Sequence, residues 1–485
     1  MRKACFVLVA IFGVLSAVIV VRTAAFKSRQ IYPPPVKQID LDQEAIVNRL
    51  ATALQFKTIS LLSPDTPGAE EFQRLRAFLT MRFPAVHERL TKELVNQHSL
   101  LYTWKGKNEQ LKPILLMAHM DVVPVDDDTR ESWTHAPFEG KIADGFVWGR
   151  GAMDDKASLM AILEAVEYLL NEGLQPQRTI YLAFGHDEEV GGSDGAAKVA
   201  ALLRARGIEL DFVLDEGMNI LSGVIDGISS PVALIGIAEK GYLSVRLTAA
   251  ASGGHSSIPP ARTAIGAVAG ALQRLQATPF SAKLDGPTGL MFDFLGPEMA
   301  WHKRLVLANL WLFEPLVKKH LAASPLMNAI LRTTLVPTIF QAGVRENILP
   351  AQASAVINLR LMPSDAITAV LAQVKRVIDD RQIEIASLAV RMEPSPVSNI
   401  HSASFKMLQR TVAETAPDAV VAPSLVVAAT DSRHYAALTP NLFRFLPITL
   451  KAEDSKRYHG VDERISVQDY LRCVRFYVQL IRNFN

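Results

Sequence analysis

The chain has 485 residues, enough for two or three domains around a large hydrophobic core. Its 51 Lys and Arg residues nearly balance 49 Asp and Glu residues, so the net charge is +2 and there is no basic excess to indicate a nucleic-acid partner. The two cysteines, Cys5 and Cys473, are poorly placed to pair, which excludes a disulfide framework and a thiolate metal site, so any metal must be held by histidines and carboxylates.

The N-terminus carries an apolar segment. Residues 4–21 contain no charged side chain and, at about 1.5 Å per residue, nearly span the hydrocarbon core of a bilayer, about 30 Å thick. We interpret residues 1–25 as an uncleaved membrane anchor, because the run is long for a signal peptide; a signal peptide cleaved near Ala24-Ala25 is the alternative. Basic residues on both sides leave the orientation open. Under either interpretation the rest of the chain is exported: membrane-anchored, or secreted or periplasmic.

Residues 26–40 contain Pro33-Pro34-Pro35 and are predicted to form a stiff, extended linker. Residues 41–240 then alternate between predicted strands and helices. Apolar runs of the kind found in buried parallel strands lie at 114–118, 179–184 and 212–214, and helices are expected at 43–56, 69–90, 158–172 and 193–206. This order predicts an α/β fold: a mixed, mostly parallel sheet with helices on both faces.

Residues 241–393 change in character and predict an inserted α+β, ferredoxin-like domain. The predicted order is β-α-β-β-α-β, with strands at 241–250, 338–342, 353–361 and 383–392 and helices at 261–276 and 365–378. Within it, residues 305–335 are strongly apolar, and we expect Pro315 and Pro325 to break them into short helices. This insertion is either a membrane-facing or substrate-covering surface, or a local packing or dimer contact. Residues 394–485 return to the first domain.

Acidic and histidine side chains follow the predicted strands. Ligands in open α/β sheets bind outside the carboxyl ends of the strands, so we expect His119, Asp121, Asp154, Glu188 and Glu189 to converge there. A set of histidines and carboxylates suits a pair of divalent zinc ions bridged by a carboxylate. Asp121 lies two residues beyond His119 on the same strand and is placed to hydrogen-bond its imidazole.

Each motif taken alone also has a simpler interpretation. One His-x-Asp on a strand is more often structural than catalytic, and Asp-Glu-Glu is usually a charged loop. His186 and Asp155 are interpreted as bystanders. The strength of the hypothesis lies in the ordered combination, and the chain carries neither a Gly-x-Ser-x-Gly elbow nor a His-Glu-x-x-His motif.

In combination, these motifs resemble the di-zinc aminoacylase, carboxypeptidase S and carnosinase family of metallopeptidases. The matching segments run in family order from about Asp42 to the C-terminus: His119-Met-Asp121-Val-Val-Pro124, Trp133 with Pro137-Phe138, Gly149-Arg-Gly-Ala-Met-Asp154-Asp-Lys156, Asp187-Glu-Glu189-Val-Gly-Gly192, Asp215-Glu-Gly217, Gly254-His255-Ser256, Ala429-Thr-Asp431-Ser-Arg433 and His459-Gly-Val-Asp462-Glu463. The 305–335 insertion and residues 338–350 most resemble carboxypeptidase S and the secreted synthase/hydrolase of N-fatty-acyl amino acids. The N-terminal apolar segment is a departure, since many soluble relatives lack it.

The resemblance implies two Zn²⁺ ions per subunit and assigns the roles around them. His119 and His459 would each bind one ion, Asp154 would bridge them, and Glu189 and Asp215 would complete the two spheres; spacing leaves Asp215 and Glu216 as alternatives, and we prefer Asp215. Glu188 would be the general base. The Asp154–Asp155 peptide bond is expected to be cis.

The resemblance further implies that residues 241–393 form a lid and dimerisation domain, so that the protein would be a homodimer. His255 would reach the partner subunit's site and stabilise the oxyanion there. Asn347 and Arg360 are similar to lid residues that grip the substrate, and Arg433 would hold its free carboxylate.

The sequence therefore predicts a zinc-dependent hydrolase of N-acyl amino acids, or of the C-terminal residue of short peptides. Its partner would be a small molecule or short peptide, with no nucleic acid. The alternatives are a carnosinase-type dipeptidase and a non-enzymatic, membrane-tethered binding protein on the same fold. The second predicts loss of a ligand or of the base, and none of those residue types is missing.

Overall fold

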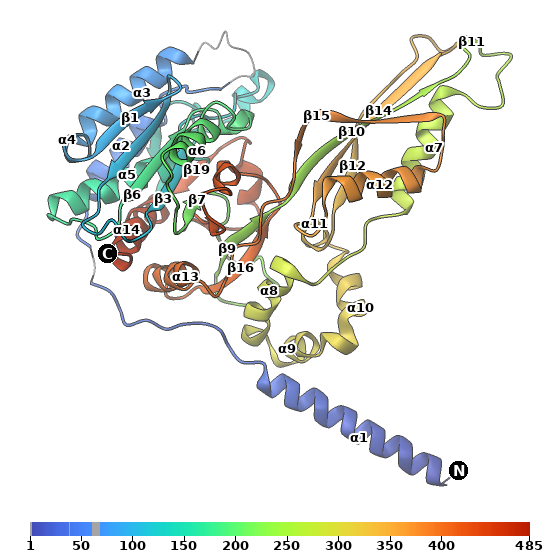
Figure 1. Ribbon diagram of the computed structural model, residues 1–485, viewed down its shortest axis with the longest axis horizontal. Coiled ribbons are helices and arrows are strands. Elements are labelled where there is room, and N and C mark those ends of the chain that lie inside the picture. Colours follow the sequence, from blue (N-terminus) through green and yellow to red (C-terminus); the bar gives the residue numbers. More distant parts are fainter. Residues whose placement is uncertain (1, 38, 61–67) are drawn as a thin grey trace.

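The computed structural model of the protein describes residues 2–37, 39–60 and 68–485. A large α/β body carries an elongated second lobe, and a long N-terminal helix projects away from both (Figure 1).

The body is built on one mixed sheet. Its strands are β1 (Thr91–Val95), β2 (Ser99–Trp104), β3 (Ile114–His119), β6 (Ile180–Gly185), β7 (Val213–Asp215), β8 (Ile220–Leu221), β9 (Val232–Glu239), β16 (Val420–Val426), β17 (Leu442–Arg444) and β18 (Thr449–Leu450). They follow the order β1-β2-β6-β3-β7-β17-β9-β8-β18, with β16 paired to β9. The four central strands β6, β3, β7 and β17 are parallel neighbours, whose carboxyl ends therefore meet at one edge.

Helices cover both faces of this sheet, which confirms the predicted α/β fold. They are α2 (Gln43–Ala53), α3 (Ala69–Arg82), α4 (Pro84–Arg89), α5 (Lys156–Asn171), α6 (Ala196–Ala205), α13 (Ala403–Thr415) and α14 (Val467–Asn483). Side chains alternate along β3: Leu116 packs into the core shared with α5 and α14, whereas Leu115 and Met117 pack into a second core that includes α6. Both faces of β3 are thus apolar, which explains its unbroken hydrophobic sequence.

One helix boundary differs from the prediction. A single helix was expected over 69–90, but α3 ends at Arg82 and α4 begins at Pro84. Proline has no backbone N–H to continue the helical ladder and disfavours a helical residue before it, so the chain turns at Phe83.

The second lobe is a four-stranded antiparallel sheet covered by two helices. Its elements are β10 (Gly241–Ala250), α7 (Ala264–Ala277), β12 (Thr334–Ala342), β14 (Gln352–Leu361), α12 (Ile367–Ile378) and β15 (Ile383–Met392), with sheet order β12-β14-β10-β15. Leu243, Val245 and Leu247 of β10 pack with Val268 of α7 and Val374 of α12 in a separate core. This chain order is the β-α-β-β-α-β order expected from the sequence. At the far tip of the lobe, β11 (Gly254–His255) pairs with β13 (Ile348–Leu349) (Figure 1).

Four helices lie between α7 and β12: α8 (Gly286–Leu295), α9 (Trp301–Ala308), α10 (Leu310–Leu321) and α11 (Pro325–Leu331). Phe292 and Leu295 of α8 and Ile330 of α11 join the main core of the body, not the core of the second lobe. The expected break at Pro315 is wrong, because Pro315 lies inside α10 and the chain turns instead at Asn309. Pro315 has no backbone N–H to donate to the carbonyl oxygen of Trp311. Because both residues are exposed, water can donate a hydrogen bond to that oxygen instead.

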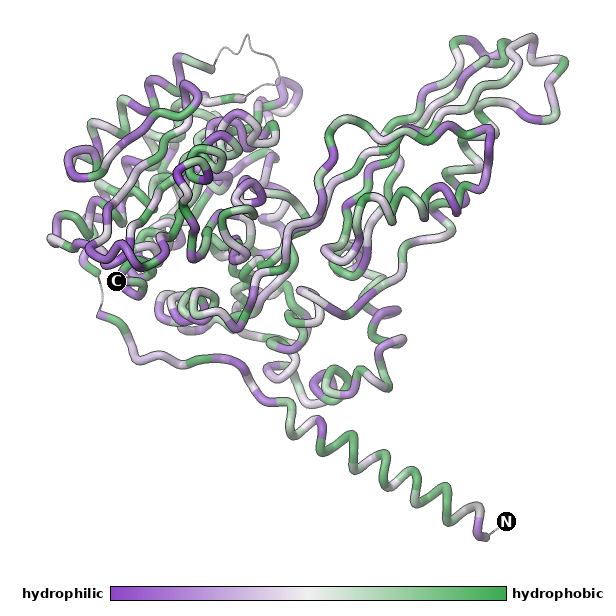
Figure 2. The backbone as a smooth tube through the Cα atoms, viewed as in Figure 1, coloured by the Kyte–Doolittle hydropathy of each residue, from purple (hydrophilic) through white to green (hydrophobic). Residues whose placement is uncertain are grey.

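The N-terminal helix α1 (Arg2–Ala25) contains the span Phe6–Ala25, with a mean hydropathy of 2.5 and only 6% of its window buried. Figure 2 shows it as a largely hydrophobic rod outside the body. The segment after it runs along the body. The side chain of Gln30 bonds both backbone groups of Val421, at 2.8 and 3.0 Å, and Gln409 donates to the carbonyl of Arg29 at 2.9 Å. The linker is therefore anchored to the body through part of its length.

Candidate metal centre

His119 is the last residue of β3, and its ring is buried. Its Nδ1 lies 3.0 Å from the carbonyl oxygen and 3.3 Å from a carboxylate oxygen of Asp121, while its Nε2 lies 2.9 Å from Oδ1 of Asp154. Burial lowers the pKa of His119, but the hydrogen bonds to Asp121 and Asp154 outweigh it and hold this pKa well above its usual value. Asp121 thus fixes the ring so that Nε2 faces Asp154. A metal-binding imidazole typically has such a partner on its other ring nitrogen.

Asp154 lies between two histidines. Its Oδ2 is 3.1 Å from Nε2 of His459, and that nitrogen is 3.2 Å from Oε2 of Glu189. Two groups of potential ligand atoms therefore share Asp154: His119, Asp154 and Glu216 form one, and Asp154, Glu189 and His459 form the other, with all atoms of each group within 4.8 Å of one another. A carboxylate that offers one oxygen to each group has the geometry of a bridging ligand.

These side chains come from distant loops at one end of the sheet. Asp154 lies in the turn between β5 (Phe146–Trp148) and α5, and the Asp154–Asp155 peptide bond is cis, as expected. Glu189 lies in the 3-10 helix η2 (Glu188–Val190) that follows β6. His459 lies in the loop before α14 with a φ of 56°, in the left-handed region.

Glu463 holds the Asp154 turn in place, a role that the sequence analysis did not assign. It is fully buried, accepts hydrogen bonds from the backbone N–H groups of Met153 at 2.8 Å and Asp154 at 3.2 Å, and pairs with Arg150 at 2.8 Å. The feature of the sequence that could have indicated this role is the position of Glu463, four residues after His459 in the last segment that resembles the family. The segment that supplies one histidine thus also positions the shared carboxylate.

The structure places Glu216, and not Asp215, in one group with His119 and Asp154, whereas the sequence favoured Asp215 as the ligand. An oxygen of Glu216 lies 4.0 Å from Nε2 of His119. The carboxylate of Asp215 is already engaged, because it accepts hydrogen bonds from the backbone N–H groups of Glu216 at 3.0 Å and Ser432 at 2.8 Å. Asp215 belongs to neither group of potential ligand atoms.

Exchanging each acid for its amide separates these roles. We expect Glu216→Gln to lower the bound metal from two ions to one per chain, since an amide is a poor ligand for a divalent cation. We expect Asp215→Asn to keep both ions but to lower the free energy of unfolding by about 1–3 kcal/mol, because a buried acceptor of two N–H groups is lost. Metal analysis and urea unfolding measure the two effects. If Asp215→Asn lost a metal ion and Glu216→Gln did not, Asp215 would be the ligand.

Glu188 lies beside both groups without belonging to either. Its backbone N–H donates to Asp121 at 3.2 Å, as does that of Glu189 at 3.1 Å, so Asp121 orients this turn as well as the imidazole of His119. Among the described residues, no hydrogen bond engages the carboxylate of Glu188. Burial raises its pKa well above the usual value; nearby His119 opposes the rise, and Asp431 and Asp154 add to it.

The donor set fits divalent metal ions. The buried Oε1 of Glu189 has no hydrogen-bond partner among the described residues, which is costly in the absence of a cation. Burial also raises the pKa of Glu216 well above its usual value; neighbouring Asp154 adds to this rise, and His119 opposes it. Imidazole and carboxylate ligands suit zinc and neighbouring first-row metals.

Two of the predicted substrate and catalytic residues, His255 and Asn347, lie apart from this centre. His255 and Asn347 meet at the tip of the second lobe, where the N–H of Ser256 donates to the carbonyl of Asn347 at 3.1 Å, and the tip is far from the carboxyl ends of the body's strands (Figure 1). Arg360 lies on β14 with its guanidinium 4.7 Å from the ring centre of Tyr242. The structure therefore does not bring His255 and Asn347 to the chain's own metal centre.

Arg433 is close to the centre but is partly occupied. Its two Nη atoms donate to the carbonyl oxygens of Thr430 at 2.7 Å and Gly191 at 2.8 Å. It therefore ties its own loop to the turn that carries Glu189.

Comparisons with known proteins identify relatives of the chain. The model of peptidase family M20/M25/M40 matches residues 115–483. The chain is 46% identical over 442 residues to a probable carboxypeptidase S-like 2 of Dictyostelium discoideum, covering 90% of this chain and 85% of that protein. It is 38% identical over 450 residues to human N-fatty-acyl-amino acid synthase/hydrolase PM20D1, covering 91% and 88%, and 30% identical over 498 residues to carboxypeptidase S of Saccharomyces cerevisiae, covering 94% and 86%.

Solved structures share the fold at low sequence identity. An M20 metallo-carboxypeptidase of Sulfolobus solfataricus, Sso-CP2, superposes with a TM-score of 0.65 at 18% identity, covering 92% of this chain and 99% of that chain. Human carnosine dipeptidase 1 superposes with a TM-score of 0.63 at 15% identity, covering 93% and 99%.

Proposed function

The chain belongs to peptidase family M20/M25/M40 and is a hydrolytic enzyme, and we propose that it uses two metal ions, zinc in the first instance, to cleave the amide bond between an acyl or peptidyl group and a C-terminal amino acid. The observation that carries this proposal is the carboxylate of Asp154, shared between two ligand groups with Glu188 beside them. His119 and Glu216 would hold one ion, and Glu189 and His459 the other.

Each residue has a definite task in this proposal. Bound divalent ions would lower the pKa of water to about 7 and polarise the substrate carbonyl. Glu188 accepts the proton of the attacking water and delivers it to the leaving amine. No hydrogen bond among the described residues engages its carboxylate, and Asp121 holds its backbone in place.

The relatives named above act on two kinds of substrate: one is a carboxypeptidase, and another is a synthase/hydrolase of N-fatty-acyl amino acids. We propose N-acyl amino acids with a long acyl chain as the first choice, because the helices α8–α11 present apolar surface beside the body. Short peptides are the second choice, as is a carnosinase-type dipeptide.

A substrate panel tests the proposal. Purified full-length enzyme would be assayed with an N-oleoyl amino acid, an N-acetyl amino acid and a blocked dipeptide, before and after chelation and after readdition of zinc. We expect turnover of the N-oleoyl substrate to exceed that of the other two, to disappear with chelator and to return with zinc. Exclusive cleavage of the dipeptide would refute the acyl preference, and metal-bound protein without any turnover would favour the binding-protein alternative.

We further propose that the second lobe is a lid through which two subunits pair, and that His255 of the partner subunit stabilises the oxyanion, with Asn347 and Arg360 of the lid contacting the substrate. The exposed position of His255 at the lobe tip, away from its own centre, supports this arrangement. Arg433 would bind the substrate carboxylate through N–H groups not used in its backbone contacts.

Mixing two inactive variants tests the exchange of His255. His255→Ala removes the donated residue, and Glu188→Gln removes the base. If each subunit completes its partner's site, co-expressed variants form some heterodimers in which one site has both groups, and we expect roughly a quarter of wild-type activity to return when half of the dimers are mixed. Activity no greater than that of the separate variants would contradict the exchange.

We also propose that α1 is an uncleaved membrane anchor. Its last turns are bound to the body: the buried amide of Asn309 donates to Oγ1 of Thr23 at 3.2 Å and to the carbonyl of Ile19 at 3.3 Å. Cleavage at Ala24-Ala25 would remove both contacts and leave the Asn309 amide with its hydrogen bond to the carbonyl of Leu305 at 2.9 Å. Intact-mass measurement of the membrane-bound protein would decide between anchor and signal peptide.

A further inference from the structure

Helix α10 is packed against the protein on only a small part of its surface. Of its residues, Val317 alone is buried. Trp311, Leu312 and Leu316 are 52, 41 and 63% exposed. Because residues four apart share a helix face, Leu312 and Leu316 form an apolar stripe with Trp311 beside it.

This stripe lies next to the end of α1. Asn309, at the junction of α9 and α10, is the residue that bonds Thr23 and Ile19 of α1, and Arg22 donates to the carbonyl of Ala308 at 3.4 Å. With 24 residues, α1 is about 36 Å long, slightly longer than the hydrocarbon core of about 30 Å. Its last turn therefore lies at the membrane surface when the helix spans the bilayer. Tryptophan is enriched at that depth, and Trp301 and Trp311 lie on the helices that flank this junction.

An apolar cavity of about 540 Å³ lies behind α10, within the range of ligand sites, about 300–1,000 Å³. Its walls come from α8, α9, α10, α11 and the loop after β8, and include Phe292, Val306, Leu321 and Met327. Leu316 lines the cavity and is also 63% exposed, so the cavity opens onto the apolar stripe. None of the candidate metal ligands lines it.

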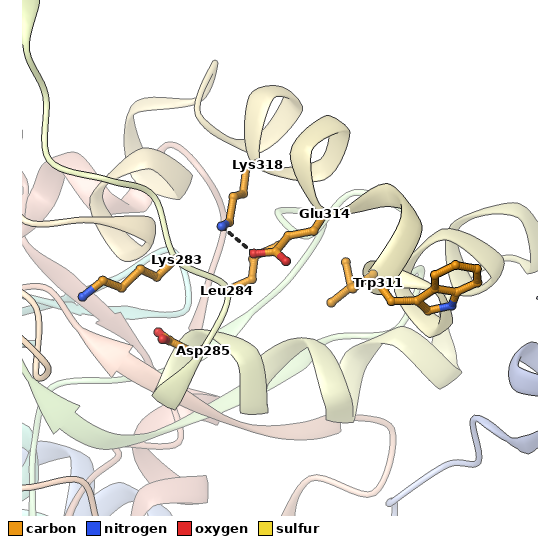
Figure 3. Close-up of a pocket in the computed structure, with 7 residues that line it drawn as sticks. Lys283, Leu284, Asp285, Trp311, Glu314 and Lys318 are labelled. Carbon is orange, nitrogen blue, oxygen red and sulfur yellow. Dashed lines mark ion pairs between the residues drawn. The ribbon is translucent and has the colours of Figure 1, made fainter.

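The opposite side of α10 is different. A hollow of about 310 Å³ separates it from residues 283–285, where Glu314 and Lys318 pair with each other and face Leu284 (Figure 3). Trp311 also lines this hollow, and it is 52% exposed. Helix α10 therefore stands between a polar hollow and an apolar cavity, with its exposed stripe uncovered by protein.

We propose that α9 and α10 sit in the membrane surface beside α1, and that the cavity behind α10 takes up the alkyl chain of an amphiphile from the adjoining leaflet. The stripe of Trp311, Leu312 and Leu316 supplies the bilayer contact, and Leu316 marks the entrance. His302, His320 and Lys303 also line the cavity and can donate hydrogen bonds to an anionic head group, although Lys303 already pairs with Asp226 beside them. The inference depends on the proposed anchoring by α1, and not on the metal chemistry.

Fluorescence quenching tests the bilayer contact in full-length protein reconstituted into lipid nanodiscs. The chain has five tryptophans, and Trp104, Trp133 and Trp148 are 4, 9 and 5% exposed in the body, beyond the reach of lipid. We expect phospholipid brominated in its acyl chains to quench the wild-type protein, and the double variant Trp301→Phe/Trp311→Phe to lose at least half of the quenched signal. Equal quenching of the double variant, or failure of the protein to enter nanodiscs, would overturn the proposal.

Photolabelling tests the cavity. The same nanodiscs would carry, in separate arms, a phospholipid or a free fatty acid with a photoreactive diazirine in its alkyl chain. We expect labelled peptides from residues 286–331, and the arm that labels them identifies the source of the chain. Labelling confined to α1 would overturn the proposal.

Substitution of Leu316 by glutamate tests the assigned entrance, and the same substitution at Leu94 serves as its control. We expect Leu316→Glu to reduce labelling of residues 286–331 at least fivefold, and Leu94→Glu, at a similarly exposed leucine (54%) on β1, to leave it unchanged. Turnover of an N-acetyl amino acid should be unaffected in both, which shows that the fold and the metal centre are intact. Labelling needs no turnover, so it distinguishes failure of this inference from failure of the proposed function. Undiminished labelling in Leu316→Glu would contradict the assigned entrance.

Discussion

Replacing Glu188 with Gln is expected to lower kcat by about 10²–10⁴-fold while leaving two metal ions bound per chain, because a positioned general base contributes about that much. The carboxylate of Glu188 belongs to neither ligand group and has no hydrogen-bond partner among the described residues, so its amide should neither displace a ligand nor unfold the site. Kinetics with an N-acyl amino acid and metal analysis of the same sample measure both effects.

Two control variants sharpen this experiment. Glu216→Gln makes the same chemical change next to the centre and should lose metal, whereas Asp127→Asn, at a surface carboxylate with 89% side-chain exposure, should change neither quantity. If Glu188→Gln lost metal as well as activity, Glu188 would be a ligand. If it kept full activity, the general base would lie elsewhere.

Asp154→Asn is expected to have the largest effect, because both ligand groups depend on one carboxylate. Its two oxygens lie 2.9 and 3.1 Å from Nε2 of His119 and His459. The amide of asparagine is uncharged and has only one oxygen, so it cannot bind two metal ions as a carboxylate does. We expect loss of both ions and a fall in activity of more than about 10⁴-fold, to the level of the chelated wild-type enzyme. Retention of one ion with measurable turnover would mean that the two positions are independent.

The raised pKa of His459 explains why metal binding by Asp154→Asn and by the wild-type enzyme must be compared at the same pH. In the metal-free protein, hydrogen bonds to Asp154 and Glu189 raise the pKa of His459 to about 10, so the imidazole is protonated at neutral pH. Metal binding has to displace that proton, and affinity therefore rises as the pH rises toward this value. A comparison at mismatched pH would confuse loss of a ligand with competition by protons.

Much of the fold could be predicted because single strands bury both faces. The apolar run that ends at His119 is hydrophobic at every position, since Leu115 and Leu116 pack into different cores. A parallel strand of this kind places its last residues at the ligand-binding edge, which is why His119 and Glu189 were expected together.

Other features depend on information that local sequence does not hold. The choice between Asp215 and Glu216 depends on where β7 ends, and a shift of one residue reverses which side chain faces the centre. Pro315 remains inside a helix because α10 is exposed on that side, a fact of tertiary structure. The role of Glu463 depends on backbone N–H groups more than 300 residues away, at Met153 and Asp154.

The insertion at residues 305–335 shows the same limit. Its apolar sequence was compatible with a membrane-facing or substrate-covering surface and with local packing or a dimer contact. Ile330 joins the main core, whereas Leu316 stays exposed. Composition could not separate the two faces, because both use the same residue types.

The central claim is that Asp154 bridges two metal ions beside a free base. Crystals of the full-length enzyme loaded with zinc, with diffraction recorded on both sides of the zinc absorption edge, test it directly. We predict two anomalous peaks about 3.5–4 Å apart, one beside His119 and Glu216 and the other beside His459 and Glu189, with Asp154 between them. A single peak, or peaks that Asp154 does not contact, would contradict the account.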